Sequence, residues 1–457
     1  MQLRAWQDEA ISSALIKFQN PYSHFLCLAT PGAGKTVMAA ELARQLLDSG
    51  RVDLVVCVSP STIIAHDFRL TLESITKRKF CGGLGASGQS ITYQSMIHLD
   101  SNFWSLFEHY RVFAIFDEIH HCAGQDQVNA NAWGRNVFKH IQNKAFYTLA
   151  LTGTPWRSDT IPITLCRYTS DDSMVQVDFK YNLKRAIKEN VCRVPVICAI
   201  DNELIYVTNK KEAKSYKSFE ALLADGECTY SNLIQHESII KYMLTMAVTQ
   251  LNREREMFPD AGGLIVASST AHAKHIQKLM ISLGESSVLV SYQEQDPTET
   301  IARFKKTNQR WIISIGMISE GTNIPRLRVC CYLSQTTTEL YFRQVLGRIL
   351  RVHSSDNETG YFFMLAHPSL VEYARRVAEE VPHIAVFNYD NSKRQRIIHD
   401  VGSSSLEIEY EQPSEDLYLN SSLSLLKKAG TQECNLDDWS VTKIGSFGRF
   451  YQQIYQL

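Results

Sequence analysis

The sequence predicts an α/β protein in which two doubly wound parallel-sheet domains follow one another, with a helical connector between them and a small C-terminal extension. Short apolar runs alternate with amphipathic helical patterns, and each run ends at a polar or glycine-rich turn. Such uninterrupted runs are typical of parallel strands that are covered on both faces. Because the alternation occurs in two separate series, we expect two domains.

The first series lies in residues 1–165, which we assign to the first domain. After its first apolar run, apolar residues from Val37 to Leu47 recur near helical spacing, and Gly50 closes this helix. The apolar runs are HFLCLA at 24–29, LVVCV at 54–58, VFAIF at 112–116 and FYTLAL at 146–151.

The second series lies in residues 261–388, which we assign to the second domain. One of its helices begins after Asp296, with Pro297 in the first turn and Glu299 three residues after the cap, a favourable start for a helix. The apolar runs are GLIVA at 263–267, VLVSY at 288–292, WIISI at 311–315, RVCCYL at 328–333 and YFFML at 361–365. The helices are expected at 270–283, 297–306 and 338–350.

The two remaining segments have other patterns. In the connector, residues 166–260, apolar residues from Ile239 to Leu251 indicate long amphipathic helices that pack against the second domain. The C-terminal extension, residues 389–457, begins with serine-rich and acidic sequence but ends in aromatic residues, which are rare in disordered chains. No functional role follows from this extension.

The composition is that of an ordinary globular protein and excludes several classes. Of 457 residues, 44% are hydrophobic and 21% are charged, and no apolar run approaches the ~18 residues that span a bilayer. We therefore expect neither a secreted nor a membrane protein. The 11 cysteines include no CxxC pair and read as buried thiols in a reducing compartment. The net charge of −1 means that any nucleic-acid contact must come from a local groove.

The segment ATPGAGKT at 29–36 follows an apolar strand and opens a helix, which is the context of a phosphate-binding loop. Gly32 and Gly34 allow the backbone N–H groups to surround phosphate oxygens, and the helix N-terminus adds its positive end. Lys35 is expected to reach the β- and γ-phosphates, and the Thr36 hydroxyl to bind Mg²⁺. Pro31 and Ala33 complete the ATP-binding set. A plain turn is the alternative reading of this octapeptide.

The segment VFAIFDEIHH at 112–121 places two adjacent carboxylates at the end of an apolar strand. Phosphoryl transfer needs a metal that neutralises charge and a group that positions and deprotonates water. We assign Asp117 to the Mg²⁺ and Glu118 to the water. An exposed loop pair is the alternative for these acids. His120, His121 and Cys122 lack the spacing of a helical zinc-ligand pair, so a zinc site is disfavoured.

The phosphate-binding loop and the Asp-Glu-x-His segment together resemble the DExH branch of the superfamily 2 helicases. Other segments fall in that family's order across residues 1–385, and the likeness is greatest to the motor subunits of type I and type III restriction enzymes. These segments are LRAWQDEAI at 3–11, VSPST at 58–62, TYQSM at 92–96, LTGTPWR at 151–157, SIGMISEGTNIP at 314–325 and QVLGRILR at 344–351.

The resemblance implies two RecA-like domains, with ATP and Mg²⁺ as cofactors. By this likeness, Gln7 hydrogen-bonds the adenine, with Arg4 nearby. Gly321 and Asn323 approach the nucleotide from the second domain, although the family more often has an aspartate at the position of Asn323. The residues expected to face the γ-phosphate are Gln344, Arg348 and Arg351.

The residues themselves agree with a single nucleotide between the domains. The second series has ASST at 267–270 where a phosphate-binding loop would begin, so it cannot bind a second ATP. It instead offers Arg348 and Arg351, whose i, i+3 spacing places them on one helix face. Arginine at such a site stabilises transition-state charge. The alternative is that both arginines lie on a solvent-exposed helix face and have no role in catalysis.

Four polar residues at strand ends are candidates for contacts to a nucleic-acid backbone. Hydroxyls and amides at such positions suit phosphate contact, which positions a strand without reading its sequence. Helix capping is the alternative role for such side chains. The four are Ser59, Thr62, Thr92 and Gln94.

The function that follows is an ATP-dependent helicase or translocase acting on nucleic acid, by resemblance DNA in the 3′→5′ direction. We expect a cytoplasmic protein of prokaryotic or phage origin, working with other subunits such as a nuclease in DNA repair or in defence against foreign DNA. No nuclease-like set of acids and lysine stands out after residue 390. The alternative is a nucleotide-gated binding switch or scaffold subunit that does not translocate.

Overall fold

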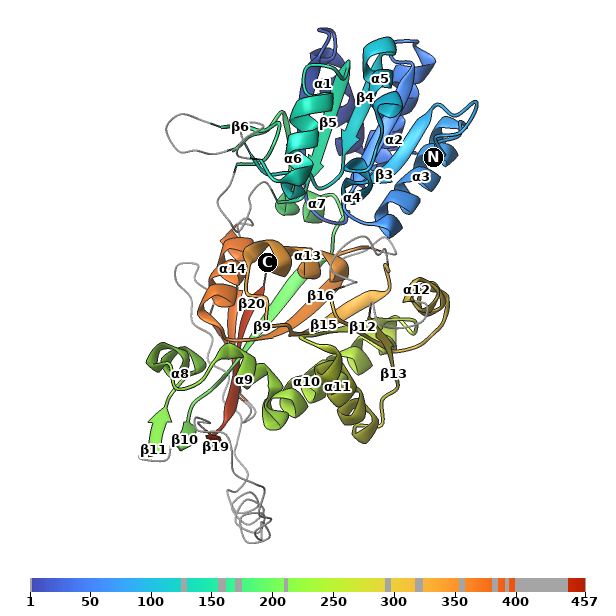
Figure 1. Cartoon of the computed structure of the whole chain (residues 1–457). Coiled ribbons are helices and arrows are strands. Elements are labelled where there is room, and N and C mark those ends of the chain that lie inside the picture. Colours follow the sequence, from blue (N-terminus) through green and yellow to red (C-terminus); the bar gives the residue numbers. More distant parts are fainter. Residues whose placement is uncertain are drawn as a thin grey trace.

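The computed structural model describes residues 2–124, 130–154, 162–168, 175–208, 213–291, 297–316, 324–352, 358–379, 385–390, 394–398 and 443–456. These residues form two α/β domains, drawn one above the other in Figure 1. The predicted fold class is therefore confirmed. Among the described helices, none combines the length and the apolar character needed to cross a membrane.

The first domain contains a parallel sheet with the order β3-β2-β4-β5-β1-β8. Alternate residues of β2 enter two different cores, with Val55 and Cys57 on one face and Val56 and Val58 on the other. Both faces are thus buried, as the uninterrupted apolar runs predict. The strands are β1 Ser23–Ala29, β2 Leu54–Ser59, β3 Gly88–Thr92, β4 Val112–Phe116, β5 Tyr147–Thr152 and β8 Phe179–Tyr181.

Helices cover both faces of this sheet. Those that supply residues to one core include α1, α2 and α3, and those that supply the other include α4, α5 and the π-helical turn η2. A short two-stranded sheet, β6 Arg167–Tyr168 and β7 Val175–Gln176, lies beside them. The helices are α1 Ala5–Lys17, α2 Lys35–Asp48, α3 Thr62–Thr76, α4 Tyr93–Met96, α5 Ser101–His109, η1 Ile119–His121, α6 Ala132–Asn136, η2 Val137–Ile141 and α7 Leu183–Lys188.

The second domain contains a larger sheet with the order β13-β14-β12-β15-β16-β9-β20-β17-β18. Its strands from β13 to β9 are parallel, whereas β20, β17 and β18 pair antiparallel. The predicted apolar runs all correspond to strands. These are β9 Val194–Asn202, β12 Gly262–Ala267, β13 Ser287–Val290, β14 Trp311–Ser314, β15 Leu327–Leu333, β16 Thr359–Leu365, β17 Ala385–Asp390, β18 Arg394–Ile398 and β20 Phe450–Gln456.

The helices of the second domain agree with the sequence pattern. The long helix α10 packs on β12, β15 and β16, as expected of the amphipathic helices in the connector. A small sheet with the order β11-β10-β19 lies beside the domain. The remaining elements are β10 Ile205–Thr208, β11 Ala213–Tyr216, α8 Phe219–Asp225, α9 Tyr230–Gln235, α10 Glu237–Met257, α11 Thr270–Ser282, α12 Pro297–Lys306, α13 Glu339–Ile349, α14 Pro368–Glu379 and β19 Lys443–Phe447.

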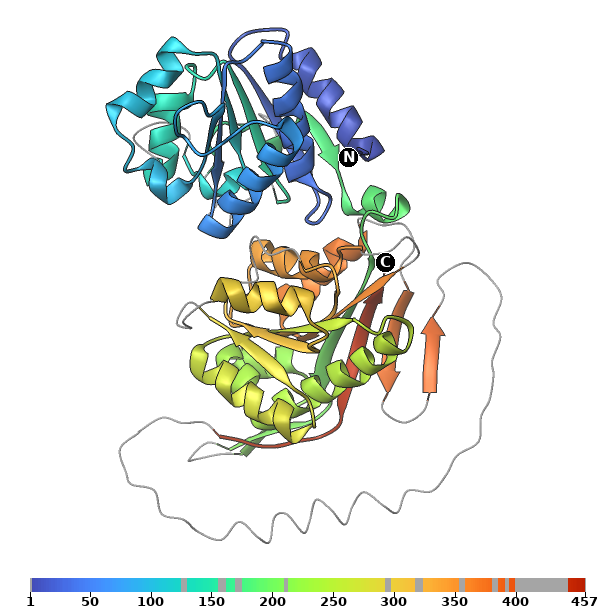
Figure 2. The same cartoon turned by 90° about the vertical axis from the view of Figure 1, so that its right-hand side faces the viewer.

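The connector and the C-terminal extension both contribute strands that the sequence pattern does not reveal. From the connector, β8 joins the first sheet and β9 joins the second, so the chain crosses between the domains through α7. From the extension, β20 lies between β9 and β17, as Figure 2 shows in red beside green. Phe450 of β20 stacks on Tyr242 of α10, with ring centroids 4.7 Å apart. The aromatic end of the chain is therefore part of the second domain.

Candidate functional site

The loop between β1 and α2 has the conformation that its glycines permit. Gly32 and Gly34 have φ angles of +85° and +99°, a region that other residues rarely adopt. Lys35 then begins α2 with a buried side chain. The sequence therefore folds here into the strand–loop–helix arrangement expected of a phosphate-binding loop.

The start of α1 holds this loop from one side. The Arg4 Nη1 donates to the Ala33 carbonyl at 2.7 Å, and the Gln7 Nε2 donates to the Gly34 carbonyl at 3.0 Å. The Gln7 Oε1 accepts from the Arg4 backbone N–H at 2.9 Å. Both side chains thus bind the backbone of the loop, and the adenine contact implied by the resemblance stays a prediction.

The two carboxylates lie at the end of β4, next to the lysine of the loop. The Lys35 Nζ is 3.3 Å from the Glu118 Oε1 and donates to the Ala29 carbonyl at 3.2 Å. Glu118 has a left-handed backbone, with φ +50° and ψ +57°. Its Oε2 accepts from the Gly153 N–H at 3.3 Å. The phosphate-binding loop, the Glu118 carboxylate and the turn after β5 therefore meet at one place.

The two acids have opposite pKa shifts. Burial and the nearby charge of Glu118 raise the pKa of Asp117 to about 7, against the opposing effect of Lys35. Burial would also raise the pKa of Glu118, but the charges of Lys35 and His120 and the Gly153 N–H outweigh it and lower that pKa. Glu118 is therefore the readily ionised member of the pair, whereas Asp117 ionises only near pH 7.

Residues around the carboxylates connect them to neighbouring segments. The His120 Nδ1 lies 3.0 Å from the Thr152 Oγ1, which joins the turn after β4 to the end of β5. The Tyr93 hydroxyl donates to the Asp117 carbonyl at 2.9 Å. Sequence reasoning missed Tyr93, although it lies inside the TYQSM segment between two candidate strand contacts.

The second domain meets the loop through α13 and through Cys192, two residues before β9. A Cβ on Gly347 would lie 2.5 Å from the Pro31 Cβ, so only glycine permits this approach of α13. A Cβ on Gly32 would lie 3.2 Å from the Arg351 Cγ, and the Cys192 Sγ is 3.8 Å from the Pro31 carbonyl. The carboxyl end of β1 thus faces the second domain.

Gln344 and Arg348 lie on α13, but this helix ends at Ile349 and Arg351 follows it in an isolated β-bridge with Cys192, so the two arginines do not share the predicted helix face. Arg348 is buried and Gln344 is half-buried. Burial and the charge of Arg348 lower the pKa of Arg351 to about 9, which leaves it charged at neutral pH. The structure therefore brings Arg351 to the loop that carries Lys35, although they are more than 300 residues apart in the sequence. Gly321 and Asn323 lie outside the described residues.

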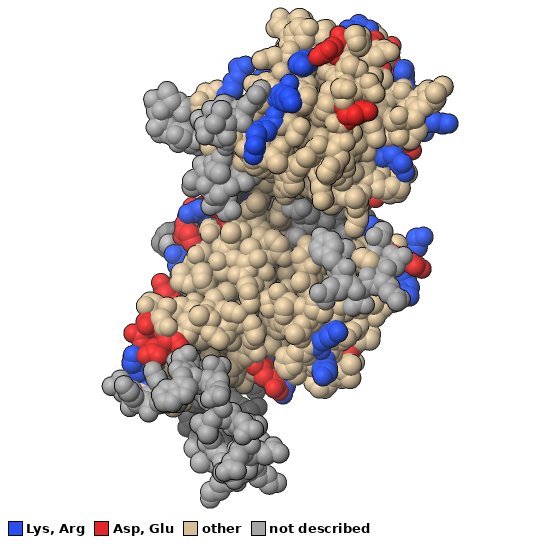
Figure 3. Space-filling model, viewed as in Figure 1, with Lys and Arg blue, Asp and Glu red and all other residues tan. Residues whose placement is uncertain are grey.

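The four residues predicted to contact a nucleic-acid backbone differ in their exposure. Ser59 is fully buried, so its hydroxyl does not face solvent in this structure. The Thr92 Oγ1 accepts from the Ser95 N–H at 3.0 Å and caps α4, which is the alternative role considered for it. Thr62 and Gln94 are exposed. On the face in Figure 3, basic and acidic side chains are scattered, with no continuous basic stripe on the part described.

Comparison with known proteins places this arrangement in a family. Residues 1–157 match the family described as "Type III restriction enzyme, res subunit". The chain is also 23% identical over 377 residues to the DNA 3'-5' translocase XPB2 of Sulfurisphaera tokodaii, covering 77% of this chain and 79% of that protein. The predicted resemblance to the superfamily 2 helicases is therefore confirmed. The match over residues 1–157 also agrees with the predicted likeness to restriction-enzyme subunits.

A further relative of this chain is an uncharacterized protein of Mycobacterium leprae, 30% identical over 400 residues. The match covers 84% of this chain and 65% of that protein, so the chain spans about two thirds of the relative's length. A protein of Mycobacterium tuberculosis, also uncharacterized, is 29% identical over 402 residues, with 84% and 64% covered.

Solved structures share the tandem RecA-like fold. A fragment of a putative HsdR subunit of a type I restriction enzyme from Vibrio vulnificus has a TM-score of 0.55 at 15% identity, covering 81% of this chain and 65% of that chain. The type ISP restriction-modification enzyme LlaBIII bound to DNA has a TM-score of 0.50 at 15% identity, with 83% and 29% covered. S. cerevisiae Dbp5 bound to RNA has a TM-score of 0.50 at 11% identity, covering 83% of this chain and 87% of that chain.

Proposed function

We propose that this protein hydrolyses ATP between its two domains and uses the cycle to move along a nucleic-acid backbone. The observation that carries the proposal is the meeting of three groups. The Lys35 ammonium and the Glu118 carboxylate lie 3.3 Å apart, and α13 of the second domain packs against the same loop. A cleft with a phosphate-binding lysine on one side and arginines on the other can sense whether a γ-phosphate is present.

The nucleotide would lie along the loop from Pro31 to Thr36, with the backbone N–H groups and Lys35 at its phosphates. Arg4 and Gln7 would lie toward the adenine, since both already contact the loop. In the structure Lys35 is paired with Glu118. A γ-phosphate would compete for the lysine, which would leave the Glu118 carboxylate available to a water molecule.

The residues fit a magnesium ion at Asp117 and Thr36. The Asp117 carboxylate is buried at the strand end, and burial and the charge of Glu118 raise its pKa, so a bound cation would favour its ionised form. A carboxylate and a hydroxyl beside phosphate oxygens are ligands that magnesium accepts. The bound ion would neutralise charge that develops on the phosphates.

Glu118 is the group that would position the attacking water and accept its proton. Its lowered pKa keeps it ionised, and the Gly153 N–H and the left-handed backbone fix its direction. Arg348 and Arg351 would stabilise the charge on the transferred phosphoryl group from the second domain. Loss of that charge after hydrolysis would weaken the contact between the domains.

Alternation between a closed state with ATP bound and an open state after hydrolysis would move the protein along one nucleic-acid strand. We propose that this strand is DNA and that movement is in the 3′→5′ direction. Support comes from the relative named a DNA 3'-5' translocase and from a neighbour bound to DNA. Thr62 and Gln94, both exposed, would contact phosphates without reading bases. We further propose that the motor works with other subunits, such as a nuclease, in repair or in defence against foreign DNA.

The test is ATP hydrolysis measured with single-stranded DNA, duplex DNA, forked DNA and RNA, followed by displacement of streptavidin from biotinylated single strands. A 3′→5′ motor is stimulated by the strand and displaces streptavidin from the 5′ end only. The matched control is Lys35→Ala. Stimulated hydrolysis without displacement from either end would identify a nucleotide-gated switch, and no hydrolysis with any nucleic acid would overturn the proposal.

A further inference from the structure

Tyr93 is a buried tyrosine that no part of the proposed mechanism uses. It begins α4, directly between the capping Thr92 and the exposed Gln94. Its hydroxyl does not face a bound strand, because the residue is 0% exposed, and it donates instead to the Asp117 carbonyl at 2.9 Å. One side chain therefore joins the short helix expected to touch nucleic acid to the backbone of the catalytic acids.

The hydrogen bond acts on the peptide that directs Glu118. The Asp117 backbone N–H donates to the Val58 carbonyl at 2.9 Å, so the residue is held on one side by β2. Tyr93 holds the carbonyl on its other side. The same peptide unit supplies the N–H of Glu118, whose φ of +50° is unusual for a residue other than glycine. A rotation of this peptide would redirect the Glu118 side chain.

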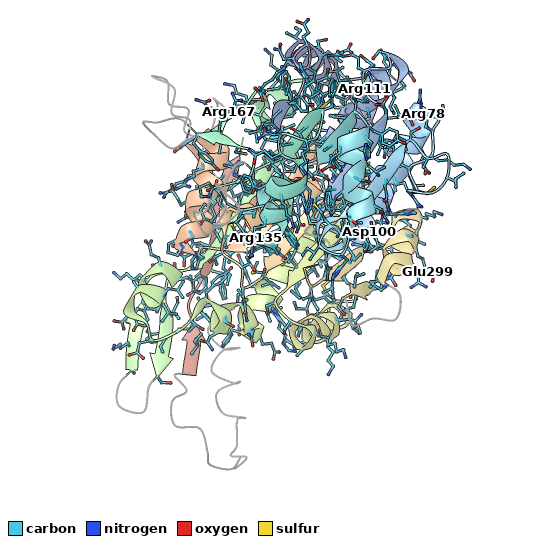
Figure 4. All side chains as sticks on the ribbon, turned by 45° about the horizontal axis from the view of Figure 1, so that its top comes forward. Arg78, Asp100, Arg111, Arg135, Arg167 and Glu299 are labelled. Atoms are coloured by element: carbon cyan, nitrogen blue, oxygen red, sulfur yellow. The ribbon has the colours of Figure 1, made fainter. Side chains whose placement is uncertain are left out.

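Aromatic packing restricts how Tyr93 can move. Its ring stacks on Trp133 of α6, with centroids 5.7 Å apart and an interplanar angle of 24°. The His121 ring, three residues beyond Glu118, lies 6.2 Å from it. Helices α4 and α6 are in contact, and α6 presents Arg135 to solvent (Figure 4). A displacement of either helix therefore reaches Tyr93.

We propose that Tyr93 couples the binding of nucleic acid to the hydrolysis of ATP. Contact of a nucleic-acid backbone with α4 shifts or stiffens this helix, and the Tyr93 hydroxyl passes the change to the Asp117–Glu118 peptide. Tyr93 is thus a positioning residue that sets the degree of stimulation by nucleic acid. The inference rests on the proposed function, because it requires an ATPase that a strand stimulates.

The test is Tyr93→Phe, which removes the hydroxyl and keeps the ring. We expect the kcat at saturating oligonucleotide to fall about tenfold more than the basal kcat, since a buried carbonyl loses a donor. The Kd for the oligonucleotide should stay within about twofold, because the hydroxyl is not at the surface. The matched control is Tyr332→Phe, which removes a buried phenol that donates to the Thr336 carbonyl in the second domain.

The outcomes separate the two proposals. Without stimulation of the wild type by any nucleic acid, the proposed function fails. If the wild type is stimulated and Tyr93→Phe keeps its stimulation ratio, only the coupling role fails. If Tyr93→Phe does not fold, hydrogen exchange of residues 116–121 in the wild type decides. Saturating oligonucleotide should slow it at least about threefold, and unchanged exchange would overturn the inference.

Discussion

Two clusters of buried charges lie at the boundary between the domains, and they differ in how fully they are paired. In the first domain, Lys35 faces two acids, Asp117 and Glu118, at the carboxyl end of the sheet. In the second, two arginines face two acids at the amino ends of β9, β15 and β16. The first cluster thus sets one lysine against two acids, whereas the second sets two arginines against two acids.

Arg193 shows how complete the second cluster is. Its Nε donates to the Glu358 carboxylate at 2.5 Å, and its other nitrogens donate to the carbonyls of Pro325, Leu327 and Ile349. Burial and the charge of Arg328 lower the pKa of Arg193 to about 10, so it remains charged at neutral pH. Matched arginines and acids stabilise the fold, whereas two acids beside a single lysine can accept a ligand cation. Substitutions should therefore have different consequences in the two places.

The largest expected effect is the loss of turnover in the first cluster. Lys35→Ala removes a phosphate contact and should abolish hydrolysis while weakening nucleotide binding. Glu118→Gln keeps the pocket but removes the base, so it should abolish hydrolysis and trap the closed, ATP-bound state. The measurements are kcat and the Kd of ATP, with Lys144→Ala as an exposed control. Near-normal kcat in Glu118→Gln would show that the base is misassigned.

The next effect concerns the arginines that complete the first cluster from the second domain. Arg351→Ala should lower kcat by at least ~10³, the size found for arginine fingers in phosphoryl transfer. Arg348→Ala should behave similarly. Exposed Arg376 on α14 provides the control substitution. If both variants turned over ATP at nearly the normal rate, hydrolysis would not depend on the second domain.

The third effect should appear in stability. Arg193→Met leaves Glu358 buried without its main partner and should lower the free energy of unfolding of the second domain by about 3–5 kcal/mol. Combining it with Glu358→Gln should recover part of this loss, because no unpaired charge then remains. Urea unfolding measures both variants. A loss below about 1 kcal/mol would contradict the view of this cluster as a stabilising one.

The smallest expected effect is a gain in stability rather than a loss. The raised pKa of Asp117 means that the folded ligand-free protein holds this proton up to about pH 7, whereas the unfolded chain loses it near its ordinary value. Ionisation therefore reduces stability as the pH rises between these values. Asp117→Asn should stabilise the ligand-free protein by about 1–3 kcal/mol at pH 8 and little at pH 4. Destabilisation at pH 8 would mean that its charge is compensated.

The parts that were predictable from the sequence are those with local signals. Uninterrupted apolar runs mark the parallel strands, and the glycines of residues 32 and 34 mark the loop. Strand β20 gives no such signal, because FYQQIYQ is rich in glutamine and its Gln452 is nevertheless buried. Its partner β9 is distant in the sequence, and pairing over such a distance leaves no local pattern.

The candidate site shows the same limit. Lys35 and Glu118 are recognisable because their chemistry is in their side chains. Tyr93 reads as an ordinary core aromatic, since its partner is a backbone carbonyl that no residue type indicates. Gln7 illustrates a third case. The resemblance implies that it contacts the adenine, whereas its bond to the Gly34 carbonyl depends on backbone geometry.

The place of β20 has a consequence for how the protein is made. The Tyr451 hydroxyl bonds to Asp201 of β9 across 250 residues. At about 5–20 residues per second, β9 leaves the ribosome about 12–50 s before β20 can pair with it. During that time β9 presents an open edge, which invites association with other chains. The first domain, whose strands are all made before residue 182, can fold in the meantime. A chaperone would thus be needed most while the second half of the chain is translated.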